Sequence, residues 1–361
     1  MANLNTRAQS EYFRRPRDQQ YASLESLYAA VCRDTVEHFS RVKDVTIKAT
    51  DYGDIVLESK DGIYSFSHFS FGQFVGDVLA LPAQVAEYTR EIPAELSVPV
   101  LAYAQQQIGE QNALLYVDKS RDQLRAVNRP SYGRILDRQI VEKLMEFTAD
   151  HPEFSPPPGW RGNDDCPLYA SDRDMFAMVI NGGSIVNVPS NRAGEDNLYL
   201  GIMVWNSEVG DGGIGCEIVS FRECCGNHCL HGVEKSTRVA FKHSANAPQR
   251  LYAEMIPAME SFMLDSPRYV KQLEDMSNRA LSFKLPADEK DKIELLTSKK
   301  IGLSKGQADR SILRAIAEEG DANTAWSVAN GITSIAKDVI HYDARSQLQH
   351  GAARLLSLAS A

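Results

Sequence analysis

The sequence predicts an α+β protein with an N-terminal helix and β-meander, a central and mostly antiparallel β region, and a helical C-terminal part. Changes in the spacing of the apolar residues predict this class. Helical spacing before residue 32 gives way to alternation over 45–69 and over 166–245, and helical spacing returns after residue 250. The expected parts are a basic arm (1–22), an α+β part (23–150), a Pro-rich linker (151–165), a β-rich part (166–250) and a helical part (251–361).

In the first half of the chain, helical spacing begins in SLESLYAAV, where Ser23 suits the N-cap position. VTIKA and GIYSFSHF alternate around turn residues and predict a small antiparallel meander. Residues 70–109 are expected to be helical, with breaks at Pro82, Pro93 and Pro99. ALLYVDKSRDQLRAV predicts two strands around a polar turn, and LDRQIVEKLMEFTADH predicts an amphipathic helix.

In the second half, HPEFSPPPGWRGNDD is predicted to be a linker, because three consecutive prolines followed by glycine cannot continue a helix or a central strand. Strand-like segments follow, joined by Gly, Asn and Asp turns. Near the end, DANTAWSVANGITSIAKDVI carries a single apolar stripe, with Asn323 as the expected N-cap.

The composition restricts the class of partner and the compartment. A net charge of −9 argues against a protein that coats duplex DNA, since such domains are usually basic, so any nucleic-acid surface has to be local. The N-terminus has no apolar h-region, and the longest apolar runs are too short to span a bilayer. We therefore expect a cytoplasmic protein with reduced thiols and no membrane association.

Familiar catalytic and nucleotide-binding motifs are absent or lack their context. GDGGIG at 210–215 has dinucleotide-binding spacing, but it is followed by the strand-like CEIVSF and not by a helix, so a hairpin turn is the better interpretation. The sequence contains no phosphate-binding P-loop, no H-E-x-x-H and no G-x-S-x-G. We expect no cofactor, and a non-catalytic protein is favoured.

Two acidic stretches leave a metal-dependent enzyme open. SDRDMF offers Asp172 and Asp174 on either side of Arg173, and WNSEVG offers Glu208. Carboxylates so placed could hold Mg²⁺. A structural turn with internal salt bridges is the favoured interpretation of both.

FRECCGNHCLHG at 221–232 concentrates cysteine and histidine at densities found in metal sites. Zinc needs four nitrogen or sulfur donors, which this stretch could supply together with His243. The paired C-x₂-C knuckles are missing, however, and free cysteine is commonly buried. We predict a tight turn between strands with neither a disulfide nor zinc.

Several motifs together resemble a phage- and plasmid-borne family called domain of unknown function 932. They are RRPRDQQYASLESL, FSFGQF, LRAVNRPSYGRI, LYASDRDMFAMVI, GIMVWNSEVG, CGNH and NTAWSVANGIT, in this order from about residue 11 to the C-terminus. The resemblance implies motif positions of unknown role at Asp172, Arg173, Asp174, Asn206, Glu208, Cys225, Asn227, His228 and His243. It also implies a mobile-element protein in a bacterial host cell, encoded near DNA-processing functions.

Basic residues interleaved with aromatic ones suggest where nucleic acid would bind. The predicted binding residues are Arg14, Arg15, Arg17, Lys119, Arg121, Arg125, Arg129 and Arg134. Single-strand channels use such groups, because phosphates pair with arginine and bases stack on rings. The predicted function is non-catalytic binding of single-stranded DNA in recombination or replication. An interaction protein, such as a host-defence antagonist or assembly factor, is the alternative beside a metal-dependent enzyme, and a homo-oligomer is compatible with each.

Overall fold

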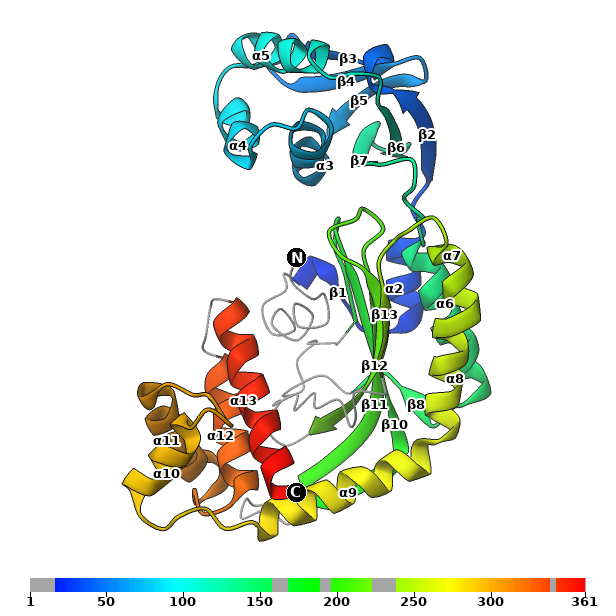
Figure 1. Ribbon diagram of the computed structural model, residues 1–361. Helices are drawn as coiled ribbons and strands as arrows, with labels where there is room; N and C mark the ends of the chain where they lie inside the picture. The colour runs from blue at the N-terminus through cyan, green and yellow to red at the C-terminus, as the bar shows by residue number, and fades with distance from the viewer. Residues whose placement is uncertain (1–16, 158–167, 189–195, 223–237, 338–341, 361) are drawn as a thin grey trace.

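The computed structural model describes residues 17–157, 168–188, 196–222, 238–337 and 342–360. Its framework is two sheets and a group of C-terminal helices, which confirms the α+β class (Figure 1). One sheet has the strand order β2-β6-β7-β5-β4-β3, and the other has the order β1-β9-β10-β11-β12-β13 with β8 paired to β10. Among the described residues, no helix combines the length and the apolar character needed to cross a membrane.

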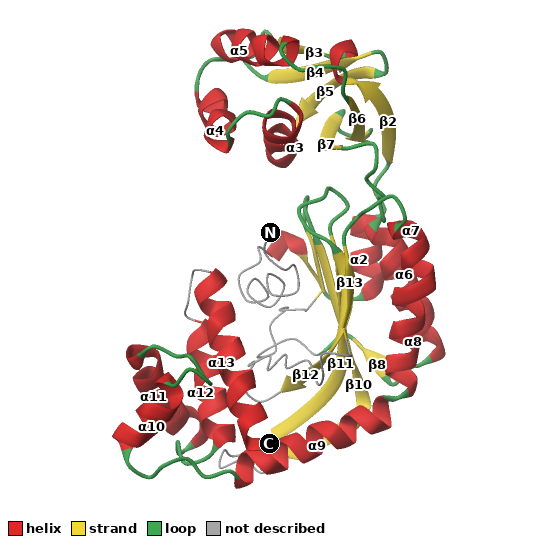
Figure 2. Ribbon diagram, in the orientation of Figure 1, coloured by secondary structure: helices red, strands yellow, loops and turns green. Residues whose placement is uncertain are grey.

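The first sheet is built from residues 35–128 and carries helices on one face (Figure 2). Its elements are β2 (Thr35–Arg41), η2 (Val42–Asp44), β3 (Thr46–Ala49), β4 (Ile55–Ser59), β5 (Gly62–Phe66), α3 (His68–Gln73), η3 (Phe74–Val78), α4 (Ala83–Glu91), α5 (Ala94–Gln106), β6 (Asn112–Asp118) and β7 (Gln123–Asn128). The predicted meander is β3, β4 and β5, and only the β5–β7 pairing in this sheet is parallel. Phe71, Phe74 and Leu101 of the helices pack with Leu57 and Leu115 of the strands in one core.

The predicted helix break at Pro99 is wrong, because Pro99 lies inside α5. A proline removes one backbone hydrogen bond from the helix interior. Ser97 and Leu101 on either side of it are fully buried, and this packing keeps the helix continuous. Pro82 and Pro93, by contrast, precede the first residues of α4 and α5, as expected.

The second sheet is antiparallel throughout its described pairings and is covered on one face by helices (Figures 1 and 2). Its elements are η1 (Arg17–Gln19), β1 (Gln20–Tyr21), α2 (Leu24–Val31), α6 (Asp137–Asp150), β8 (Phe154–Ser155), β9 (Leu168–Ala170), β10 (Met175–Val188), β11 (Asp196–Asn206), β12 (Ile214–Arg222), β13 (Arg238–Phe241), α7 (Ala247–Arg250), η6 (Leu251–Met255) and α8 (Ile256–Leu264). Ser23 caps α2 as predicted, and its hydroxyl accepts from the Ser26 amide. GDGGIG spans the end of the β11–β12 turn and the first two residues of β12, which confirms the hairpin.

The core of the second sheet combines residues from different predicted parts of the chain. Leu27 of α2 and Leu144 of α6 share one cluster with Val179 of β10 and Met259 of α8. Both helices belong to the expected 23–150 part, yet they cover the second sheet. Residues 35–128 are therefore an insertion between α2 and α6. Within the predicted linker over 151–165, Phe154 of β8 belongs to the same core, and residues 158–165 lie outside the described residues.

The C-terminal helices form their own core against the far ends of β10 and β11. They are α9 (Ser266–Ser282), α10 (Glu289–Thr297), α11 (Lys305–Glu319), α12 (Ala325–Lys337) and α13 (Tyr342–Ser360). Trp326, Ile332 and Leu355 pack with Val186 and Leu198 of the sheet. The predicted N-cap of α12, Asn323, is displaced by one residue, because the Thr324 hydroxyl accepts from the Ser327 amide.

Candidate functional site

The segment Asn206–Asp211, at the turn between β11 and β12, meets the inserted unit. Gln73 of α3 and Asn128 of β7 each donate a side-chain hydrogen bond to the Val209 carbonyl, at 2.9 and 3.1 Å. Gly210 has φ +92°, which favours glycine, and a Cβ there would lie 3.0 Å from the Asn128 amide nitrogen. This turn joins the two sheets and separates a buried ionic cluster from a pocket.

Glu208 is the centre of the buried ionic cluster, which also contains Arg125, Tyr116 and Asp137. Its Oε2 lies 2.7 Å from Arg125 Nη1 and 3.0 Å from the Tyr116 hydroxyl, while its Oε1 accepts from the Asp137 amide at 2.7 Å. Glu208 and Arg125 are only 3% and 5% exposed. Arg33 Nη1 lies 4.0 Å from the same carboxylate. The cluster ties β6 and β7 of the inserted unit to α6 and to the β11–β12 turn.

The two carboxyl groups of this cluster have opposite protonation preferences. Burial alone would raise the pKa of Glu208, but the positive charges of Arg125 and then Arg33 hold that pKa below its ordinary value. Burial raises the pKa of Asp137 well above its ordinary value, and the negative charge of Glu208 adds to this effect. Glu208 is therefore the counter-ion of the guanidiniums, and Asp137 favours its neutral form, with its Oδ1 2.8 Å from Asn206 Nδ2.

Aromatic rings extend the ionic cluster. The Arg134 guanidinium lies 3.7 Å from the centre of the Tyr116 ring, and it forms a 2.8 Å ion pair with Glu37. His243 stacks on Tyr132 at 5.1 Å, and its Nδ1 lies 3.1 Å from the Gly133 carbonyl oxygen. Burial lowers the pKa of His243 to about 4, so its imidazole is neutral at neutral pH.

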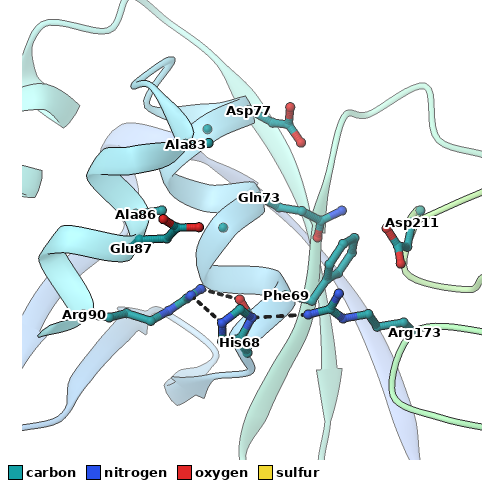
Figure 3. Close-up of a pocket in the computed structure, with 13 residues that line it drawn as sticks. His68, Phe69, Gln73, Asp77, Ala83, Ala86, Glu87, Arg90, Arg173 and Asp211 are labelled. Atoms are coloured by element: carbon teal, nitrogen blue, oxygen red, sulfur yellow. Dashed lines mark hydrogen bonds between the residues drawn. The ribbon is translucent and has the colours of Figure 1, made fainter. Parts of the chain in front are cut away.

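On the other side of the β11–β12 turn is a pocket of about 500 Å³, here called the junction pocket (Figure 3). It lies between α3, η3 and α4 of the inserted unit and the loops that precede β10 and β12. The lining residues are His68, Phe69, Gly72, Gln73, Gly76, Asp77, Ala83, Ala86, Glu87, Arg90, Arg173, Gly210 and Asp211. A Cβ added to Gly76 would meet no atom within 4 Å, and one added to Gly72 would meet only the tip of Arg90 at 3.9 Å, so the helix presents bare backbone to the pocket.

One end of the junction pocket is cationic. Arg90 Nη1 lies 2.8 Å from His68 Nε2, and Arg173 Nη2 lies 3.2 Å from His68 Nδ1 (Figure 3). Arg173 also lies over the Phe69 ring, with 5.3 Å to its centre. Among the described residues, neither guanidinium forms an ion pair with a carboxylate. The charge of Arg90, then burial, then the charge of Arg173 lower the pKa of His68, so its imidazole favours the neutral form.

The predicted nucleic-acid residues separate into surface and interior groups. Lys119, Arg121 and Arg129 are exposed, and Lys119 lies 3.4 Å from Asp34. Arg125, which was also predicted to bind nucleic acid, lies in the interior and pairs there with Glu208. The Arg134 guanidinium is also engaged, by Glu37 and by the Glu208 carbonyl.

The acidic residues considered for a metal do not converge. Asp174 is buried and accepts from the Ser171 hydroxyl at 2.6 Å, as a structural turn would require. Asp172 is exposed and contributes its backbone carbonyl to Arg125. Glu208 is occupied by Arg125. Within the described part of the chain, no group of three or more metal-ligating side chains comes together.

The remaining predicted residues lie outside the described side chains. Some of them fall outside the described residues altogether, namely Arg14, Arg15, Cys225, Asn227 and His228. Arg17 begins η1, and only its backbone is described. The predictions for the cysteine cluster therefore stay predictions.

Sequence reasoning missed most of the junction pocket. FSFGQF carried the signal, since Phe69, Gly72 and Gln73 recur at helical spacing on the side of α3 that faces the pocket. The sequence alone gives this motif no role. Arg90, which lies 22 residues from His68, has no signal in the sequence.

Comparison with known proteins adds no identification: no family model, curated protein or solved structure matches the chain. The resemblance to domain of unknown function 932 stays a prediction.

Proposed function

We propose that the protein binds single-stranded nucleic acid without catalysis and that the junction pocket holds one phosphate group of the strand. The observation that carries the proposal is that Arg90 and Arg173 both contact His68 and that neither forms an ion pair with a carboxylate among the described residues. The negative charge of Glu87 acts on Arg90 more weakly than burial and the charge of Arg173 do. Two converging guanidiniums suit the oxygens of a phosphate.

The surroundings of this pair support a nucleic-acid ligand. Phe69 lines the same pocket, and an aromatic ring offers a stacking surface to any base. Away from the pocket, the exposed Lys119, Arg121 and Arg129 remain available for further phosphates. Because the chain carries a net charge of −9, binding has to depend on such local groups.

The motif resemblance suggests a biological setting for this activity. We propose that the chain is a member of the phage- and plasmid-borne family that it resembles. It would then act in recombination or replication of a mobile element, in the cytoplasm of a bacterial host.

One observation favours the alternative of an interaction protein. Leu96, Val100 and Tyr103 recur along one side of α5 and are 61%, 50% and 66% exposed. Large apolar side chains gathered in this way mark contact surfaces. Light scattering of the native protein and of a Leu96→Glu/Tyr103→Glu variant tests this alternative, since a surface used for self-association would lose its oligomer.

Fluorescence anisotropy with labelled oligonucleotides at low salt tests the nucleic-acid proposal. Gly76→Phe should fill the junction pocket and abolish or strongly weaken binding, because its Cβ points into open space within the pocket. Gly306→Phe is the matched control, since Gly306 is also a helical glycine with nothing within 4 Å but lies in α11. Circular dichroism should show both variants folded.

The outcomes separate the activity from its location. Undetectable binding by the native protein would refute the activity. Equal binding by the native protein and both variants would keep the activity but remove it from the junction pocket.

A further inference from the structure

The His68 ring has too few acceptor nitrogens for the two guanidiniums that contact it, although the His68 backbone carbonyl accepts a hydrogen bond from Arg90. A guanidinium only donates hydrogen bonds, and a neutral imidazole has a single acceptor nitrogen. Arg90 Nη1 lies against His68 Nε2, and Arg173 Nη2 lies against His68 Nδ1. One of these two contacts therefore brings an N–H toward another N–H, whichever tautomer the ring adopts.

An anion would relieve this conflict. An oxyanion bound beside the His68 ring could accept from the guanidiniums on its two edges and replace the contact in which two N–H groups meet. The mutual repulsion of the charges would fall, since the positive charge of Arg173 already lowers the pKa of Arg90, second to burial. The site thus holds two guanidiniums around one imidazole, with more donors than the ring can satisfy.

The rest of the junction pocket limits how much negative charge can enter. The pocket is also lined by three carboxylates, those of Asp77, Glu87 and Asp211, so its lining contains more carboxylates than guanidiniums. Figure 3 shows Asp77 at the end of the pocket away from His68. A strand that passed through the whole pocket would bring further phosphates beside these carboxylates, which repel them.

These carboxylates are compatible with a single nucleotide at the end of a strand. Asp77 and Glu87 can accept hydrogen bonds from the exocyclic amino groups of a base, and a pocket of about 500 Å³ is within the range of small-ligand sites. A terminal phosphate monoester carries a charge of about −1.5 to −2 at neutral pH. An internal diester carries a single negative charge. The Arg90–Arg173 pair therefore favours the monoester.

We propose that the junction pocket captures the terminal phosphate monoester of a single strand, with Arg90, Arg173 and His68 as the binding residues. This inference rests on the proposed single-strand binding and specifies which part of the strand the pocket recognises. The geometry fits a phosphate at either end, so the experiment has to distinguish the 5′ end from the 3′ end.

The test compares three versions of one internally labelled decadeoxycytidylate, whose bases carry an exocyclic amino group: with a 5′-phosphate, with a 3′-phosphate and with neither. One phosphorylated version should bind at least about tenfold more tightly than the version without phosphate, as expected for a gain of charge-assisted hydrogen bonds. Arg90→Gln and Arg173→Gln should each abolish that preference. Arg310→Gln, which removes an exposed arginine of α11 outside the pocket, should leave it intact.

Each other outcome overturns a defined part of the inference. Equal affinity for all three oligonucleotides would refute terminal capture and leave single-strand binding standing. A preference that persists in Arg90→Gln and Arg173→Gln would refute the location. No binding of any version would refute the proposed function itself. Inorganic phosphate should compete with the preferred oligonucleotide in the native protein, and a failure to compete would count against phosphate as the recognised group.

Discussion

Replacing Glu208 by Gln should destabilise the protein strongly, because the substitution removes the counter-ion of a buried guanidinium. Arg125 is 5% exposed, and its Nη1 lies 2.7 Å from Glu208 Oε2. The new side-chain amide could still accept from the Asp137 backbone N–H, so the main loss is the negative charge. Breaking a buried ion pair from one side costs about 3 to 5 kcal/mol. That is a large fraction of the roughly 5 to 15 kcal/mol by which folded domains are stable.

Urea unfolding at pH 7, followed by circular dichroism, measures this loss. The Arg250–Glu254 pair supplies a matched control, since its Nη2 and Oε2 are also 2.7 Å apart but the side chains are 34% and 45% exposed. Water solvates both partners of such a surface pair, so Glu254→Gln should leave the urea midpoint nearly unchanged. The two substitutions make the same chemical change at the same distance, and they differ in burial.

A double variant separates the lost charge from lost packing. Arg125→Met combined with Glu208→Gln removes the buried Arg125 charge that has lost its partner, so it should recover part of the stability lost in Glu208→Gln alone. The reasoning would be refuted if Glu208→Gln were as mild as Glu254→Gln. It would also be refuted if the double variant were less stable than the single one.

Three further changes test other parts of the structure by urea unfolding. The free energy of unfolding of Asp137→Asn should stay within about 1 kcal/mol of that of the native protein at pH 8. Burial raises the pKa of Asp137, so its charged form destabilises the fold as the pH rises, and asparagine carries no such charge. A loss like that of Glu208→Gln would contradict this. His243 has a pKa lowered to about 4, so the native state should lose up to about 3 kcal/mol as the pH falls from 6.5 toward 4, and His243→Gln should flatten this part of the profile. Gly331→Ala should lower the free energy of unfolding by about 1 to 3 kcal/mol, because its Cβ would lie 2.2 Å from the Ser311 carbonyl oxygen where α12 crosses α11. Gly306→Ala, whose Cβ would lie in open space, should show no such loss.

The sequence predicted local structure well where a single segment decides it. Ser23 caps α2 because the capping hydrogen bond lies within four consecutive residues. The hairpin at GDGGIG followed from the strand-like residues on its two sides. Pro99 was misjudged because the packing of Ser97 and Leu101, which keeps α5 continuous, depends on elements distant in sequence.

The candidate site was predictable only in fragments, because its partners come from distant segments. Arg125 and Arg129 look alike in the sequence, yet Arg125 lies on a strand between β5 and β6 and meets a carboxylate 83 residues later, whereas Arg129 is exposed after the strand ends. Counting basic residues cannot separate the two. The apolar stripe of α6 likewise predicts a buried face but cannot say which of two sheets covers it.

The insertion of residues 35–128 explains why the ionic cluster and the junction pocket lie next to each other. The chain leaves the second sheet after α2 and returns before α6, so the inserted unit is held by covalent links at both ends and by the turn that contains Glu208. The Glu208 side chain faces the cluster, while Gly210 and Asp211, two and three residues later, line the pocket. Arg173 and His68 reach the pocket from opposite units, so their separation depends on how firmly the units are joined. The buried pair of Arg125 and Glu208 therefore fixes the distance across which the junction pocket would hold the phosphate that we propose as its ligand.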